Sequence, residues 1–148
     1  IRGTNEEGKR VDMKDMTMKG SSGFGLYGNN SFLCKDMTFT QCGRHGVYAA
    51  SNTKGRLINC VITQCGWSGI YCWVNALIEL EGEQTKVEGN VTGGCSSSYG
   101  LRTFSTSSRI HLLIPLTKES VSTNNHGGRN YGGNGTIKTV DSFETSCV

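Results

Sequence analysis

The sequence contains one pattern three times: Lys14-Asp-Met-Thr-Met-Lys-Gly-Ser-Ser-Gly-Phe-Gly-Leu-Tyr-Gly28, Lys35-Asp-Met-Thr-Phe-Thr-Gln-Cys-Gly-Arg-His-Gly-Val-Tyr-Ala49 and Ile58-Asn-Cys-Val-Ile-Thr-Gln-Cys-Gly-Trp-Ser-Gly-Ile-Tyr-Cys72. The copies align without a gap and begin at residues 14, 35 and 58. Such a short period predicts a protein built from stacked units, because no unit can bury its apolar face alone. The repeat therefore decides the fold, whereas it leaves the function open.

Each copy alternates apolar and polar residues with a period of two, which indicates strands rather than helices. In the second copy, Met37 and Phe39 lie on one face of a first strand. A second strand, Val47-Tyr48-Ala49, places its Tyr outward, and a third segment such as Leu77-Ile78-Glu79-Leu80 closes the coil. Three short strands in each copy predict an all-β fold, a right-handed parallel β-helix (solenoid) of about five to six short coils.

A fourth, weaker copy extends from Asn90 to Thr103. Its larger spacing from the third copy predicts about eight extra residues within Glu79 to Gly89, which we expect to form a projecting loop. We predict a single β-helix domain over residues 1–148, with regular coils over 11–105 and an irregular C-terminal coil or cap over 106–148.

The composition excludes several classes of protein. With 35% hydrophobic residues, 18% charged residues and a net charge of +3, the chain is neither disordered nor strongly basic, and its scattered Lys and Arg residues predict no nucleic-acid binding. No apolar run is long enough to span a bilayer. The opening Ile1-Arg-Gly-Thr4 resembles the end of a strand, so we expect a fragment of a larger chain whose first coil meets a cap, a further domain or an end-to-end partner.

The cysteines and the glycosylation motifs point to different compartments. Seven cysteines, an odd number without a C-x-x-C motif, indicate buried thiols rather than a disulfide framework or a zinc site. Three sequons, which begin at Asn29, Asn90 and Asn134, favour secretion instead. These signals leave the compartment open, and we favour an extracellular, cell-surface or virion-associated location.

The pattern Asp-Met-Thr-x-x-x-Cys-Gly-x-x-Gly-Val-Tyr at residues 36–48 resembles the coils of the pectin-lyase-like right-handed β-helix superfamily. The resemblance covers about residues 11 to 105 and looks closest to uncharacterised β-helix repeat proteins of unicellular algae and the large viruses that infect them. It implies either an inert scaffold or an enzyme acting on polyuronates or polygalacturonans, with paired carboxylates or a basic residue beside calcium on the outer face of neighbouring coils. The outward positions of the first and second strands here hold Thr and Tyr, so the sequence favours a protein without enzymatic activity.

Stacked coils bring equivalent residues into rows about 4.8 Å apart. Tyr27, Tyr48, Tyr71 and then Arg102 form one outward row. Flat aromatic rings suit the faces of sugar rings, and an Arg suits a uronate or a sulfate, so this row is our candidate glycan-binding site. Two other interpretations stay open, namely lateral stabilisation of the coil by cross-strand aromatic pairs and an interface with another protein.

Arg44 and His45 are the alternative catalytic candidates, because a His beside an Arg can act as a general base. A single His in a turn is more often a solvated or capping residue, so we assign no catalytic residue. His111 and His126 lie in the degenerate part of the sequence, where neither has a recognisable partner.

A polar row begins the first strand of each copy and consists of Asp15, Asp36, Asn59 and Asn90. Ca²⁺ takes several oxygen ligands, but two of these four residues are amides. A turn ladder, in which Asx side chains hydrogen-bond the backbone, is the better interpretation. We predict no metal site and no cofactor.

Our leading function is a non-catalytic β-helix module, structural or adhesive, that presents an outer face to a glycan or a protein neighbour. The alternative is a polysaccharide lyase, hydrolase or epimerase of the pectin-lyase-like superfamily. A minor alternative is an ice-binding solenoid, because a double file of outward threonines, Thr17, Thr38, Thr40 and Thr63, resembles a flat ice-binding array. Threonine is also a good strand former on an exposed face.

Overall fold

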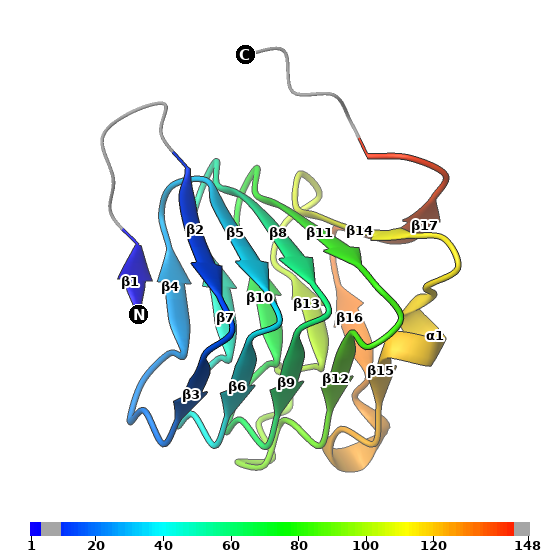
Figure 1. The fold of residues 1–148 in the computed structure, drawn as a ribbon. Helices are drawn as coiled ribbons and strands as arrows, with labels where there is room; N and C mark the ends of the chain where they lie inside the picture. Colours follow the sequence, from blue (N-terminus) through cyan, green and yellow to red (C-terminus); the bar gives the residue numbers. More distant parts are fainter. Residues whose placement is uncertain (4–9, 144–148) are drawn as a thin grey trace.

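The computed structural model, which describes residues 1–3 and 10–143, is a coil of short strands wound around one axis (Figure 1). Each full turn of the coil adds one strand to each of three parallel sheets, which we name A, B and C. The structure confirms the predicted all-β parallel β-helix, since sheets A and B each contain six strands.

Sheet A consists of β1 (Arg2–Gly3), β4 (Leu26–Gly28), β7 (Val47–Ala49), β10 (Ile70–Cys72), β13 (Leu101–Thr103) and β16 (Tyr131–Gly133). Sheet B consists of β2 (Val11–Lys14), β5 (Phe32–Lys35), β8 (Lys54–Ile58), β11 (Leu77–Glu81), β14 (Arg109–Leu113) and β17 (Thr136–Val140). Sheet C consists of β3 (Thr17–Lys19), β6 (Thr38–Thr40), β9 (Val61–Thr63), β12 (Lys86–Glu88) and β15 (Ser122–Thr123). A short helix, α1 (Lys118–Val121), contacts β12, β15 and β17, and a 3-10 turn, η1 (His126–Gly128), follows β15.

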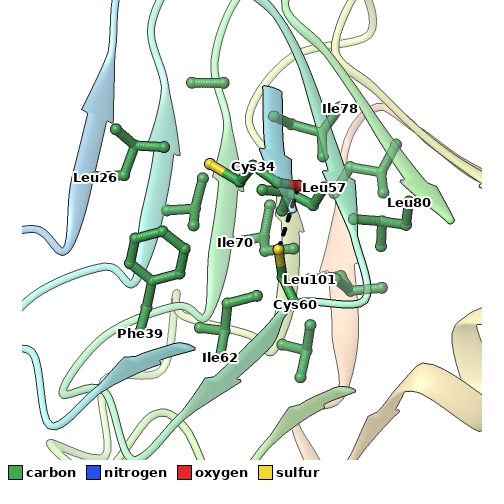
Figure 2. Packing of buried hydrophobic residues seen from close by; sticks show 14 of the residues in the cluster. Leu26, Cys34, Phe39, Leu57, Cys60, Ile62, Ile70, Ile78, Leu80 and Leu101 are labelled. Atoms are coloured by element: carbon green, nitrogen blue, oxygen red, sulfur yellow. Dashed lines mark hydrogen bonds between the residues drawn. The ribbon is translucent and has the colours of Figure 1, made fainter. Parts of the chain in front are cut away.

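The core is a set of inward columns in which each coil contributes a residue of similar size. In sheet A, Leu26, Val47, Ile70 and Leu101 lie beside one another in register and are fully buried. Figure 2 shows how this column packs against inward residues of the other sheets, among them Phe39 and Leu57. Inward strand positions of a solenoid are mostly apolar, which is why the repeat of the sequence is so regular there.

Five of the cysteines lie in this core and are free thiols: Cys34, Cys42, Cys60, Cys65 and Cys72. The Sγ atom of Cys60 lies 3.5 Å from the carbonyl oxygen of Cys34, one coil away, as Figure 2 shows. Burial raises the pKa of the Cys60 thiol to about 11. A buried thiol with such a pKa packs as a small apolar side chain.

The corners between sheets require special backbone conformations. Asp15, Asp36 and Asn59 turn the chain from sheet B to sheet C with φ values of 56°, 53° and 50°, a left-handed conformation that Asp and Asn tolerate well. Gly46 ends the next turn, directly before β7 of sheet A, and a Cβ atom there would lie 2.4 Å from Cγ2 of Ile62. The turn residues of the repeat are therefore as constrained as its core.

The register of the fourth copy differs from the one that the sequence predicts. Lys86 pairs with Val61 in the sheet, which continues to place Asn90 beside Cys65 rather than beside Asn59. Asn90 resembles the Asx residues of the earlier copies in chemical type only. The backbone N–H of Asn59 donates to the carbonyl of Glu81, and the backbone N–H of Gln84 donates to Oδ1 of Asn59, so the residues after Glu81, rather than Asn90, lie against Asn59.

The extra residues lie only in part where the sequence analysis predicted them. The distance in sequence between paired residues is 23 for Lys54 and Leu77, 25 for Val61 and Lys86, and 31 for Ile70 and Leu101. Two extra residues therefore lie before β12 and six lie in the segment 89–100, which joins sheet C to sheet A. The larger insertion borders the outer face of sheet A.

Asn90 begins an internal ladder of amide side chains. Its Nδ2 donates to the carbonyl of Ile62, and its Oδ1 accepts from the backbone N–H of Cys65. Asn125, one coil further, repeats the arrangement by accepting from the backbone N–H of Asn90. Buried polar side chains are stable here because the neighbouring backbone supplies their partners.

We expect Ile70→Asp to prevent folding. The substitution places an unpaired carboxylate in the fully buried column of sheet A, which costs at least about 4 kcal/mol. Far-UV circular dichroism and thermal unfolding measure the effect, with Ile70→Val as the control that keeps the column apolar. A cooperatively folded Ile70→Asp protein with a melting temperature near that of the parent would contradict this account of the core.

Candidate functional site

The outer face of sheet A contains the row of residues predicted from the sequence. Tyr27, Tyr48, Tyr71 and Arg102 lie beside one another in register on β4, β7, β10 and β13. The ring centroids of Tyr27 and Tyr48 are 5.0 Å apart, and those of Tyr48 and Tyr71 are 5.5 Å apart. The structure therefore brings all four predicted residues together.

Aromatic side chains from the turns widen this row on both sides. Before the strands, Phe24 and His45 stack at 5.6 Å, and Trp67 meets His45 edge-on at 5.2 Å. After the strands, Trp73 and Phe104 stack with centroids 3.7 Å apart. Together these rings form one cluster, which we name the aromatic face: Phe24, Tyr27, His45, Tyr48, Trp67, Tyr71, Trp73 and Phe104.

Most rings of the aromatic face cover one another. Phe24 and Tyr48 are stacked at 5.3 Å, and Tyr71 is only 6% exposed. By contrast, Trp67 and Phe104 are each 39% exposed and lie at the two sides of the cluster. The spacing of the coils packs the tyrosines against their neighbours, so the surface for an incoming flat ligand lies mainly on Trp67 and Phe104.

Two arginines lie on the aromatic face. The guanidinium carbon of Arg102 is 4.2 Å from the ring centre of Tyr71, and that of Arg44 is 5.0 Å from the ring centre of Trp67. The segments that build this face, residues 20–30, 41–53, 64–75 and 89–107, contain no Asp or Glu. Cation–π contacts hold the guanidinium planes against the rings and leave the face positively charged.

His45 is buried and neutral. Its Nδ1 accepts a hydrogen bond from the backbone N–H of Ser68 at 3.1 Å, so the ring proton sits on Nε2. Burial lowers its pKa to about 3, helped by the positive charges of Arg102 and Arg44. This geometry fits a capping role for His45. It does not fit a general base, because the ring has no lone pair left to accept a proton from a ligand.

Of the predicted turn ladder, Asn59 shows the expected hydrogen bond between an Asx side chain and the backbone, because its Oδ1 accepts from the backbone N–H of Gln84. Asp15 and Asp36 lie exposed at the same corner in the left-handed conformation, and Asn90 lies outside this row. Within residues 1–3 and 10–143, no group of three or more His, Cys, Asp or Glu side chains is placed to hold a metal ion.

The outer face of sheet C differs from a flat threonine array. Thr38 lies beside Thr17 and Val61, and Thr63 lies beside Thr40, but the following strand places Lys86 and Glu88 in the same two rows. The threonine pattern thus ends after three coils.

Sheet B contains a polar cluster that the sequence analysis missed. Glu79 and His111 lie beside each other in register on the outer side of β11 and β14, so the expectation that His111 has no recognisable partner is wrong. Arg56, on the preceding strand, donates to Glu79 Oε1 from Nη2 at 3.1 Å and from Nε at 3.3 Å. The alternation Leu77-Ile78-Glu79-Leu80 was the available signal, because it places Glu79 outward.

The fold defines a class of protein, and comparison with known families agrees with it. Residues 2–113 match the family model described as "Right handed beta helix region". The match covers well over half of the sequence, and the chain belongs to this family of right-handed β-helix proteins. Searches of the curated proteins and of the solved structures returned no match. Among the described residues, no helix has the length and apolar character needed to cross a membrane.

The burial of His45 predicts a specific dependence of stability on pH. Its pKa is about 3 in the folded protein and near 6.5 when unfolded, so below pH 6.5 the unfolded chain binds a proton that the folded chain does not. The stability associated with neutral His45 is present above pH 6.5 and falls by about 1.4 kcal/mol per pH unit below it.

Urea unfolding of the parent and of His45→Gln between pH 7.5 and 4.5 tests this prediction. Gln keeps an acceptor for the Ser68 N–H and cannot be protonated, so its stability should fall less steeply with pH. Parallel curves for the two proteins would show that His45 is not the buried neutral group described here.

Proposed function

We propose that this protein is a non-catalytic β-helix module that binds a glycan on the aromatic face. The observation that supports the proposal most directly is the pair of exposed rings, Trp67 and Phe104, which lie on either side of a tyrosine row on a rigid sheet. Aromatic rings with adjacent hydrogen-bonding edges suit pyranose rings, whose faces are apolar and whose rims carry hydroxyls.

Each part of the aromatic face has a distinct role in this proposal. Trp67 and Phe104 provide the surfaces on which sugar rings stack. Tyr27 and Tyr48 are half-buried and present phenol groups as hydrogen-bonding partners, whereas the buried Tyr71 packs beside Tyr48 in the same row. Arg102 lies at the end of the row, where its nitrogens can bond to hydroxyl or carboxylate oxygens of the ligand.

The solenoid supports the fit to a polymer. Neighbouring tyrosine rings repeat at 5.0 and 5.5 Å along the coil axis, which is close to the length of one pyranose in an extended chain. An extended polysaccharide lying along this axis would meet similar chemistry at successive residues. Because each ring is held by its neighbours, little side-chain freedom is lost on binding.

The alternative enzyme, a polysaccharide lyase, hydrolase or epimerase of the pectin-lyase-like kind, has less support at this face. Acid–base catalysis needs a group that can exchange a proton within reach of the ligand. The segments of the aromatic face contain no carboxylate, and the Nδ1 lone pair of His45 is used by Ser68. A protein neighbour is the other possible occupant of the same exposed rings.

We expect Trp67→Ala and Phe104→Ala each to weaken binding to a retained polysaccharide by about tenfold, because each removes an exposed stacking surface. The measurement is affinity electrophoresis through gels containing plant, algal and bacterial polysaccharides, with polymer length determined afterwards. Ile114→Ala is the control. It also removes an exposed apolar side chain, but Ile114 comes directly after β14 of sheet B, away from the aromatic face.

Retention that depends on Trp67 and Phe104, with polymer of unchanged length, supports the proposal. Shortened polymer would replace it with the enzyme, and Arg44 and His45 would be the first residues to substitute. No retention on any polysaccharide would leave a protein neighbour as the occupant of the face.

A further inference from the structure

The fold places the three glycosylation motifs of the sequence in different surroundings. Asn29 lies between β4 and β5, and Asn134 lies between β16 and β17, so both occupy the corner that joins sheet A to sheet B. Asn90 lies between β12 of sheet C and β13 of sheet A. N-linked glycosylation adds a bulky polar group to an Asn side chain, so it requires an acceptor at the surface.

The first motif, Asn29-Asn30-Ser31, is exposed at both residues that define it. The side chains of Asn29 and Ser31 are exposed, and the motif forms a short turn that starts directly after β4. The inward column of sheet A ends before this turn, because Leu26 is the residue of β4 that faces the core. A sugar attached to Asn29 therefore leaves the core and the sheet hydrogen bonds unchanged.

The third motif, Asn134-Gly135-Thr136, has the same exposure. Asn134 and Thr136 are both exposed, and the Nδ2 of Asn134 donates one long hydrogen bond, to the carbonyl of Phe104 at 3.4 Å. A side-chain amide nitrogen carries two hydrogens and keeps one after a sugar is attached, so this bond can persist. The N–H of Gly135 donates to Oγ1 of Thr103 at 3.0 Å, which holds the turn against the preceding coil.

The second motif, which begins at Asn90, has no room for a sugar. Asn90 is only 1% exposed, and its Nδ2 donates to the carbonyl of Ile62 at 3.0 Å. Even a Cβ atom added to Gly69 would lie 2.9 Å from this nitrogen. Attachment of a sugar would move the amide out of the internal ladder and leave buried backbone groups without their partners, which is costly.

The buried cysteines are compatible with an oxidising compartment, where N-linked glycosylation takes place. Five of the six described cysteines are buried free thiols. Burial raises the pKa of Cys65 to about 12 and that of Cys72 to about 12. Oxidation and disulfide exchange proceed through the thiolate, so thiols of this kind are inert inside the fold. Their number therefore does not argue against the glycosylation motifs.

We propose that Asn29 and Asn134 are N-glycosylation sites of this protein and that Asn90 is not. The donor is an oligosaccharide linked to a lipid through a diphosphate. In the transfer, Nδ2 of the Asn forms a bond to C1 of the first sugar and loses one proton. The bond between C1 and the diphosphate oxygen breaks, and the lipid diphosphate leaves with its electron pair.

Mass spectrometry of the full chain, secreted from a eukaryotic cell line behind a cleavable signal peptide, tests the proposal. Protein is recovered from the medium and from the cells, and its intact mass is compared before and after an amidase that releases N-linked glycans. The amidase converts each modified Asn to Asp, so peptide mapping then locates the sites. We expect two glycans on each folded molecule, at residues 29 and 134, and an unmodified residue 90.

Substitutions of the hydroxyl residues assign each glycan without changing an Asn. Ser31→Ala and Thr136→Ala should each remove one glycan, whereas Thr136→Ser keeps the hydroxyl and should keep the glycan. Thr92→Ala is the matched control. It destroys the motif at Asn90 but leaves the amide of Asn90 in the ladder, and Thr92 is itself exposed, so the number of glycans should stay the same.

The absence of a glycan at residue 29 or at residue 134, in both the secreted and the cell-retained protein, would overturn the proposal. A glycan at residue 90 in protein that unfolds cooperatively would do the same. So would retention of the parent in the cells if the double variant Ser31→Ala/Thr136→Ala is secreted, because glycans at these corners should leave folding intact. None of these results depends on polysaccharide binding by the aromatic face, because the attached mass is measured without a ligand.

Discussion

Backbone hydrogen bonds between successive coils hold each residue beside its counterpart one coil away, and the rest of the structure depends on this register. Inward columns such as Val47 and Ile70 stay apolar because every coil faces the same interior. Outward residues are also placed beside their counterparts in the next coil. A Tyr that occurs once in each repeat therefore forms a row of tyrosines on the surface, spaced by one coil.

The same register limits what the aromatic row can do. Rings one coil apart are close enough to pack against each other, and Tyr48 has Tyr27, Tyr71 and other rings as neighbours. Their faces then stabilise the sheet, as cross-strand aromatic pairs do. Stacking surface remains where the array ends in the turns, at Trp67 and Phe104. In the proposed function, lateral stabilisation and ligand binding are thus divided between different rings of one cluster.

The fold and the tyrosine row could be predicted from the sequence because both follow from the repeat within strands. Trp67 and Phe104 could not be assigned, since turn residues have no fixed direction until the path of the coil is known. The polar cluster on sheet B could not be predicted for another reason. An insertion whose position the sequence does not fix separates Glu79 from His111, so their pairing became clear only from the register of the strands. Asn90 shows the converse error, because similarity to Asn59 in chemical type suggested a pairing that the sheet does not make.

The distribution of charge separates the two outer faces further. The segments that build the aromatic face contain no carboxylate. A carboxylate there would face only aromatic rings and arginine side chains. On sheet B, Glu79 is tolerated in a fully buried state because Arg56 and Lys54 of the preceding coil lie against it. Removing one partner of such a pair leaves an uncompensated charge, so the fold requires the cations beside Glu79. A solenoid can in this way place an aromatic face and an ion-paired polar cluster on different sheets of one coil, each defined by a few outward positions.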